Sequence, residues 1–172
     1  DNPLYEHAYE TDNYFYMIKD VPAASSNWLT TGMGDCGNSI CMDEDVLFEI
    51  GRNAGNPSES DLDDKKGWYL ELAPHEQVVT SAITVFGSAT FSTHIPYVDS
   101  GDTCSSDLGT ANVYNVRYKN AAPSRPNALN RYEEIEGGGL PPSPVAGLVR
   151  LDNGVIVPFI IGADPSSPLE GG

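Results

Sequence analysis

Short runs of aromatic and β-branched residues alternate with clusters of Gly, Pro, Asn, Asp and Ser along this chain of 172 residues. Runs of this kind favour β-strands, and the polar clusters between them favour turns. Two segments carry helix signals instead. In 43–51, acidic residues come first, apolar residues follow and Gly51 ends the run. In 58–67, Ser58 can cap the start, acidic residues come early and lysines come late before Gly67. We predict helices over 43–51 and 58–67, and strands over 4–9, 14–18, 68–72, 77–85, 90–94, 111–118 and 131–136.

The last third of the chain predicts a β-hairpin between 148 and 162. Its two apolar runs meet at Asp152-Asn153-Gly154, where Asn153 and Gly154 suit the positive φ angles of a tight turn. Two further hairpins are predicted, one joining strands 4–9 and 14–18 and the other turning at 86–88. The segments 21–38 and 120–130 are rich in small and polar residues, so we expect loops there.

A block of glycines and prolines precedes this last hairpin. Consecutive glycines allow positive φ or a close approach of two backbones, and prolines hold a chain extended. We interpret the block as structural, with a proline-rich ligand for an aromatic groove as the alternative. The residues assigned to it are Gly139, Leu140, Pro141, Pro142, Pro144 and Gly147.

Composition supports one all-β domain over residues 1–172. The chain has 17 Gly and 13 Pro, and Tyr, Val, Thr and Ile fill its apolar runs, which points to many short strands with many turns. A chain of this length is large enough for a single core. Propeller blades consist of short strands in successive hairpins, so we predict part of a propeller, with a sandwich or partial barrel as the alternative.

Acidic residues outnumber basic ones by 25 to 9, which gives a formal net charge of -16. Such a surface repels nucleic-acid phosphates and anionic membranes, so we expect neither as a partner. The simplest interpretation is a solvated acidic surface, with cation binding as the alternative. The chain contains no apolar run long enough to span a bilayer. It also lacks the pattern of a signal peptide at its start, so we expect a soluble piece of a longer protein.

The three cysteines predict a disulfide rather than a metal site. Cys36 and Cys41 lie in one loop and Cys104 in another, with no Cys-x-x-Cys spacing and no histidine nearby in sequence. We predict a local Cys36–Cys41 disulfide formed in an oxidising compartment. Cys104 is then left over, and the alternative is that it pairs with Cys36, Cys41 or a cysteine outside this chain.

We expect no catalytic residues. His7, His75 and His94 are dispersed, no Gly-x-Ser-x-Gly elbow occurs, and the three glycines at 137–139 precede prolines rather than a helix. The aromatic runs at 14–16 and 68–69 are interpreted as core and edge packing, with a carbohydrate platform as the alternative.

Five segments, in this order along the chain, resemble the C-terminal region of the PilC/PilY family of type IV pilus factors. Each is a weak signal alone, but their order and joint presence are specific, and the resemblance runs from about residue 5 to the end. The segments are 14–20, 65–72, 76–94, 104–114 and the stretch Gly-Leu-Pro-Pro-Ser-Pro-Val-Ala-Gly at 139–147.

This resemblance implies a secreted, non-enzymatic protein that promotes pilus extension and holds the pilus tip, with surface adhesion in many members. The implied fold is part of a quinoprotein-like β-propeller, and because that propeller is much longer than this chain, the chain would supply its C-terminal blades. The implied partners are pilin or minor pilins and a host or abiotic surface. The implied location is the cell surface, pilus tip or outer membrane, reached through the periplasm.

The family's calcium loop, a run of alternating aspartates, is missing here. The nearest acidic clusters hold Asp43 and Asp45, and Asp61, Asp63 and Asp64. Asp61 and Asp63 together offer only two of the roughly six to eight oxygens that calcium needs, so we expect no cofactor, with calcium as an alternative. A redox enzyme that retains a quinoprotein-type cofactor is a further alternative. Open sheet edges would also allow two copies to associate.

Overall fold

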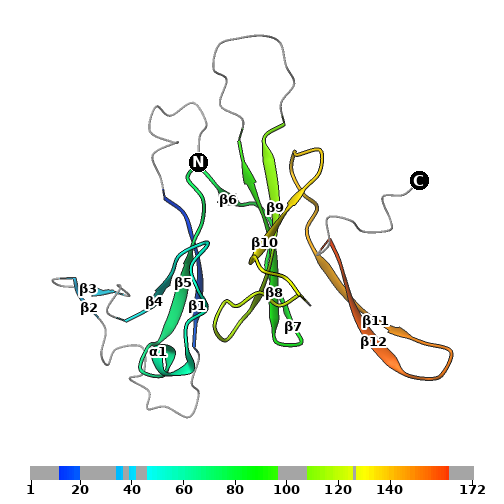
Figure 1. Ribbon diagram of the computed structural model, residues 1–172, viewed down its shortest axis with the longest axis horizontal. Coiled ribbons are helices and arrows are strands. Elements are labelled where there is room, and N and C mark those ends of the chain that lie inside the picture. The colour runs from blue at the N-terminus through cyan, green and yellow to red at the C-terminus, as the bar shows by residue number, and fades with distance from the viewer. Residues whose placement is uncertain are drawn as a thin grey trace, which may run out of the picture.

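The computed structural model describes residues 12–19, 34–36, 39–41, 46–96, 108–125 and 127–162, with the backbone alone for 34–36, 39–41 and Pro158. Strands dominate this part of the chain and confirm the all-β class (Figure 1). They form sheets of three, five, two and two strands, and the described residues close no barrel or propeller.

The N-terminal sheet has three strands in the order β1-β5-β4. Strand β1 (Tyr14–Ile18) runs antiparallel to β5 (Gly67–Glu71), and β4 (Phe48–Ile50) runs parallel to β5. A parallel pair needs a long crossover, and α1 (Glu59–Asp63) lies in this one. The predicted strand 14–18 is confirmed with β5 as its partner, while the partner predicted from sequence, 4–9, lies outside the described residues.

The prediction of a helix over 43–51 is wrong where the structure describes it, because Phe48–Ile50 is strand β4. Phe48 and Ile50 pack on the core, and Glu49 between them faces solvent. In a sheet, a period of two buries both apolar side chains, and this gain outweighs a weak local helix signal. The helix predicted over 58–67 is confirmed as α1, but it is shorter because Gly67 already begins β5.

The central sheet is antiparallel throughout, in the order β10-β9-β8-β6, with β7 also paired to β8. Phe86 and Gly87 have φ angles of 49° and 83°, both positive as a type I′ turn requires, which confirms the predicted turn at 86–88. The predicted edge strand at 131–136 is confirmed as β10. The strands are β6 (Gln77–Val78), β7 (Ile83–Val85), β8 (Ser88–Ile95), β9 (Thr110–Arg117) and β10 (Tyr132–Ile135).

Aromatic side chains join the two sheets. The ring of Phe15 stacks on Phe91 with 3.9 Å between centroids, and Phe91 stacks on Tyr114, its partner across β8 and β9, at 4.9 Å. Trp68 is buried beside Phe15 and donates from Nε1 to the carbonyl of Tyr118 at 2.9 Å. The same buried cluster contains Ile50, Leu62, Leu70, Leu72, Ala89, Val116 and Ala121.

A fully buried carboxylate, Glu76, anchors the turn that leads from β5 to β6. The turn has Pro74 and a positive φ of 64° at His75, and it is closed by a 3.0 Å hydrogen bond from the Glu76 amide to the Ala73 carbonyl. The carboxylate also pairs with Arg52 Nε at 3.3 Å. Its hydrogen-bond donors are Ala73 N at 2.8 Å, Thr93 Oγ1 at 2.5 Å, Asn112 Nδ2 at 2.9 Å and Tyr114 OH at 3.0 Å.

Arg52 joins this carboxylate to the aromatic core. Its Nε donates to Tyr114 OH at 2.9 Å, and its guanidinium lies 3.6 Å from the centroid of the Tyr132 ring. Burial lowers the pKa of Arg52, but Tyr114 and Glu76 outweigh that effect and the pKa is raised. Burial, followed by the charge of Glu76, raises the pKa of Tyr114 well above its usual range, so its hydroxyl keeps the proton that it donates.

A second buried cation, Arg131, fastens the segment after β4 to the central sheet. Its guanidinium donates to the carbonyls of Ala121 at 2.8 Å, Ala54 at 2.6 Å and Gly55 at 3.1 Å. Burial lowers the pKa of Arg131. Because backbone carbonyls satisfy its donors, this arginine holds two loops in place from a single side chain.

The predicted C-terminal hairpin is confirmed as β11 (Val145–Arg150) and β12 (Ile156–Ile161). Its turn differs from the prediction, because Gly154 has a positive φ of 84° but Asn153 does not. Gly154 N donates to Leu151 O and Leu151 N to Val155 O, both at 2.8 Å, so the loop has three residues and ends in a glycine bulge. Asn153 instead accepts the Val155 amide through Oδ1 at 3.0 Å.

The loop predicted over 21–38 contains a strand near its end. Gly34–Cys36 (β2) pairs antiparallel with Ser39–Cys41 (β3) as a small separate hairpin. Backbone pairing between Asp35 and Ile40 thus replaces part of the predicted loop. The rest of 21–38 lies outside the described residues.

Replacing Glu76 with alanine should lower the free energy of unfolding by about 3–5 kcal/mol, because it leaves Arg52 and three side-chain donors buried without their acceptor. Urea denaturation measures this change. The matched control is Glu134→Ala on the exposed side of β10, which should change stability by less than about 0.5 kcal/mol. Equal losses in the two variants would show that Glu76 is not an anchor.

Candidate binding surfaces

The β11–β12 hairpin exposes apolar side chains on both of its faces. Leu148 is 68% exposed and Ile156 is 61% exposed on one face, while Val145 is 59% exposed on the other. The hairpin lies beside the central sheet, on the side away from the N-terminal sheet (Figure 1). The other exposed large apolar residues of 145–161 are Val149, Leu151, Val155, Phe159 and Ile161.

The glycine and proline block fixes the base of this hairpin. Gly137, Gly138 and Gly139 all have positive φ, as the sequence suggested. A Cβ on Gly138 would stand 2.2 Å from the carbonyl oxygen of Gly109, so the glycine allows this segment to lie against the start of β9. Pro144, just before β11, is buried.

Two other residues of the block belong to the exposed surface. Leu140 is exposed, and Pro142 is exposed beside the half-buried Pro141. Gly147 lies in β11 opposite Phe159, whose ring covers it so closely that a Cβ would stand 2.6 Å from the ring edge. The ring thus fills the space that a side chain at 147 would take.

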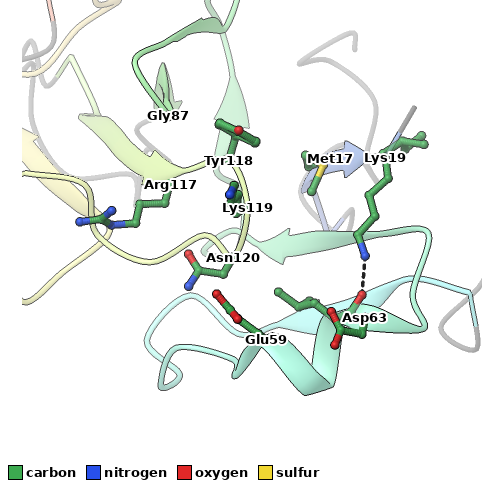
Figure 2. Close-up of a pocket in the computed structure, with 11 residues that line it drawn as sticks. Met17, Lys19, Glu59, Asp63, Gly87, Arg117, Tyr118, Lys119 and Asn120 are labelled. Atoms are coloured by element: carbon green, nitrogen blue, oxygen red, sulfur yellow. Dashed lines mark hydrogen bonds between the residues drawn. The ribbon is translucent and has the colours of Figure 1, made fainter. Parts of the chain in front are cut away.

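A cleft of about 830 Å³ opens between the N-terminal sheet, α1 and the turn after β9. Figure 2 shows Glu59 and Asp63 on the α1 side, facing Lys119 and Asn120 on the other. Lys19 Nζ donates to the carbonyl of Leu62 at 2.5 Å. The other lining residues are Met17, Ile18, Leu62, Gly87, Arg117 and Tyr118.

The chemistry of this cleft is that of a mixed-charge surface. Its described lining residues include lysines, an arginine and carboxylates, but no serine, cysteine or histidine. That set lacks the nucleophile and base of the hydrolase arrangements considered from the sequence. Lys19 and Lys119 both line the cleft although they are far apart in sequence, and no local pattern predicted it.

The aspartates considered for calcium have other roles where the structure describes them. Asp61 closes a capping box with Ser58, accepting from the Ser58 amide at 2.8 Å and from its hydroxyl at 2.7 Å. These hydrogen bonds from Ser58 lower the pKa of Asp61. Asp63 lines the cleft and Asp64 is the C-cap of α1. Asp43 and Asp45 lie outside the described residues, so calcium binding stays an alternative to the predicted absence of a cofactor.

The histidines and cysteines form no metal-binding group within the described residues, where no three His, Cys, Asp or Glu side chains gather. His94 hydrogen-bonds the carbonyl of Leu108 at 2.8 Å through Nε2. Cys36 pairs in backbone register with Ser39, and Cys41 pairs with Gly34. The cysteine side chains, Cys104 and His7 lie outside the described part, so the disulfide stays a prediction.

Comparison of the chain with family models, with curated proteins and with solved structures found no match in any of the three. Within the described residues, no helix is long and apolar enough to cross a membrane.

The capping box predicts a pH dependence of stability. Because Ser58 lowers the pKa of Asp61 in the folded state, the bond stabilises the fold above the ordinary aspartate pKa of about 4. That stabilisation is lost as pH falls through the lower folded value. We expect Asp61→Asn to lower the urea midpoint at pH 7, and the difference from the unmodified protein to shrink by pH 3. A difference that stays constant would contradict this assignment.

Proposed function

We propose that this chain is a non-catalytic, secreted assembly and adhesion module of a type IV pilus tip or biogenesis factor. The observation that carries the proposal is the exposed apolar hairpin β11–β12. The order of the segments that resemble the PilC/PilY family supplies the biological context, and pilin or minor pilins are the proposed partners.

A hairpin of this composition needs a partner for energetic reasons. A two-stranded sheet is marginally stable in water unless one of its faces is packed. Leu148 and Ile156 are mostly exposed on one face, and Val145 is on the other. Covering each such side chain fully is worth roughly 1.5–3 kcal/mol, so a partner that buries several of them gains enough for a stable complex.

The charge distribution favours contact through this hairpin. Arg150 and Asp152 are the charged residues of 145–161 and they balance, although the chain as a whole carries -16. A second copy carries another -16 over its whole chain, so overall charge repulsion opposes self-association. A partner that is less acidic than this chain avoids that cost.

We also propose that the described sheets are blades of a propeller that other segments complete. Strands β8, β9 and β10 form an antiparallel meander in chain order, which is how a blade is connected. The parallel pairing of β4 with β5 departs from that pattern. The N-terminal sheet would therefore be a modified blade.

The test is a double variant of the hairpin, Leu148→Thr with Ile156→Thr. Threonine keeps the strand preference but removes apolar surface, so the fold should persist while binding to purified minor pilins weakens at least tenfold. Biolayer interferometry at 150 mM salt measures binding, and circular dichroism confirms folding.

Leu129→Thr is the matched control, because Leu129 is 94% exposed and lies outside the hairpin. It should leave binding unchanged. The proposal fails if minor pilins do not bind the unmodified chain, or if the double variant binds as well as the control.

A further inference from the structure

The outer face of the N-terminal sheet carries a group of tyrosines that the core does not use. Along β1 and β5, Phe15, Met17 and Trp68 turn inward, so Tyr14, Tyr16 and Tyr69 share the opposite face. Tyr16 pairs directly with Tyr69 across the two strands and is 55% exposed. We call these three residues the tyrosine face.

The three rings are close together but not coplanar. Tyr14 meets Tyr69 edge to face, with 5.4 Å between centroids and an angle of 84°. Tyr16 lies 5.9 Å from Tyr69 at 32° and 6.2 Å from Tyr14 at 59°. A flat sugar ring stacks on a flat aromatic platform, whereas mutually tilted rings present negative π faces in several directions, as cation recognition requires.

Carboxylates surround these rings. Glu71 is the cross-strand partner of Tyr14, and Glu49 is the partner of Tyr69 on β4. Burial, followed by the charges of Asp12, Glu71 and Glu49, raises the pKa of Tyr14, as expected if these groups face its hydroxyl. The remaining outward positions on these strands are Ile18 and Gly67, so no Lys or Arg of β1, β4 or β5 offsets the negative charge.

We propose that the tyrosine face binds the cationic side chains of a basic polypeptide segment. The rings supply cation–π contact and the three carboxylates supply charge complementarity for Lys or Arg. A second copy of this chain, at -16, is a poor occupant, and an acidic or phosphorylated segment is repelled.

This inference goes beyond the proposed function, because it concerns a different face and needs neither the hairpin nor a pilus. Leu148→Thr with Ile156→Thr should therefore leave it unchanged. Either proposal can fail while the other stands. The hairpin variant tests only the first, and the variants of the tyrosine face and its carboxylates test only the second.

The experiment titrates the full chain with tetralysine and follows tyrosine ring signals by NMR at about 150 mM salt, where the Debye length is about 8 Å. The Tyr16→Ala variant should bind about two- to fivefold more weakly, and Tyr16→Phe should bind like the unmodified chain, because phenylalanine keeps the ring. Glu49→Gln with Glu71→Gln removes two charges without changing shape and should weaken binding at least fivefold.

The matched control is Glu134→Gln with Glu136→Gln, which removes the same number of charges from exposed positions away from the tyrosine face. Its affinity should stay within about 1.5-fold of the unmodified chain, since a local site does not depend on distant charges. An equal loss in both double variants would reduce the effect to net charge. Binding of cellotetraose in place of tetralysine, or no binding of either, would also overturn the proposal.

Discussion

The fold depends on the burial of one negative charge. Glu76 has no contact with water, and an uncompensated carboxylate in such a place would cost several kcal/mol. Its four donors and Arg52 come from the turn after β5, from β8, from β9 and from the segment after β4. The two sheets must therefore meet in one arrangement for the carboxylate to be satisfied. Aromatic stacking alone would let the two sheets slide relative to each other, whereas the hydrogen bonds of Glu76 fix their relative position.

This anchor determines which surfaces face outward. Once Phe15 stacks on Phe91, the alternation of β1 and β5 directs Tyr14, Tyr16 and Tyr69 to the opposite side of the N-terminal sheet. The central sheet is then covered by the N-terminal sheet on one side, and the β11–β12 hairpin stands beyond it (Figure 1). The two proposed binding surfaces thus lie at opposite ends of the described sheets, so two partners can bind without competing.

Local signals in the sequence predicted local structure. The helix that begins after Ser58 and the turn at Asp152-Asn153-Gly154 each depend on residues within a few positions of each other, so the sequence pattern located both. The all-β class and most strand positions follow from β-branched and aromatic runs for the same reason. The hairpin turn was located correctly although its φ pattern was not, because a three-residue loop and a two-residue loop share the Asn-Gly signal.

Contacts between segments far apart in the sequence could not be predicted from local patterns. In the sequence nothing distinguishes Glu76 from the other acidic residues, of which the chain has 25 in total. Its role appears only when the fold brings Asn112 and Tyr114 of β9 to its carboxylate. Strand β4 pairs in parallel with β5 after a long crossover, and the residues around Phe48–Ile50 do not indicate which strand they will pair with. The local pattern therefore predicted a helix over 43–51. The same parallel pairing places Glu49 opposite Tyr69, beside the tyrosine face.

Several of the few basic residues are engaged in contacts within the fold, which leaves the surface carboxylates largely unneutralised. Arg131 is buried and Arg52 is largely so, and their guanidinium groups hold backbone carbonyls, Tyr114 and Glu76. Lys19 is bound to the carbonyl of Leu62, and Arg125 is paired with Glu133. With only 9 basic residues in the chain, such structural uses leave little positive charge to neutralise the surface carboxylates. The two proposed surfaces therefore differ in chemistry: the hairpin is nearly neutral and offers apolar contact, whereas the tyrosine face is negative and suits cations.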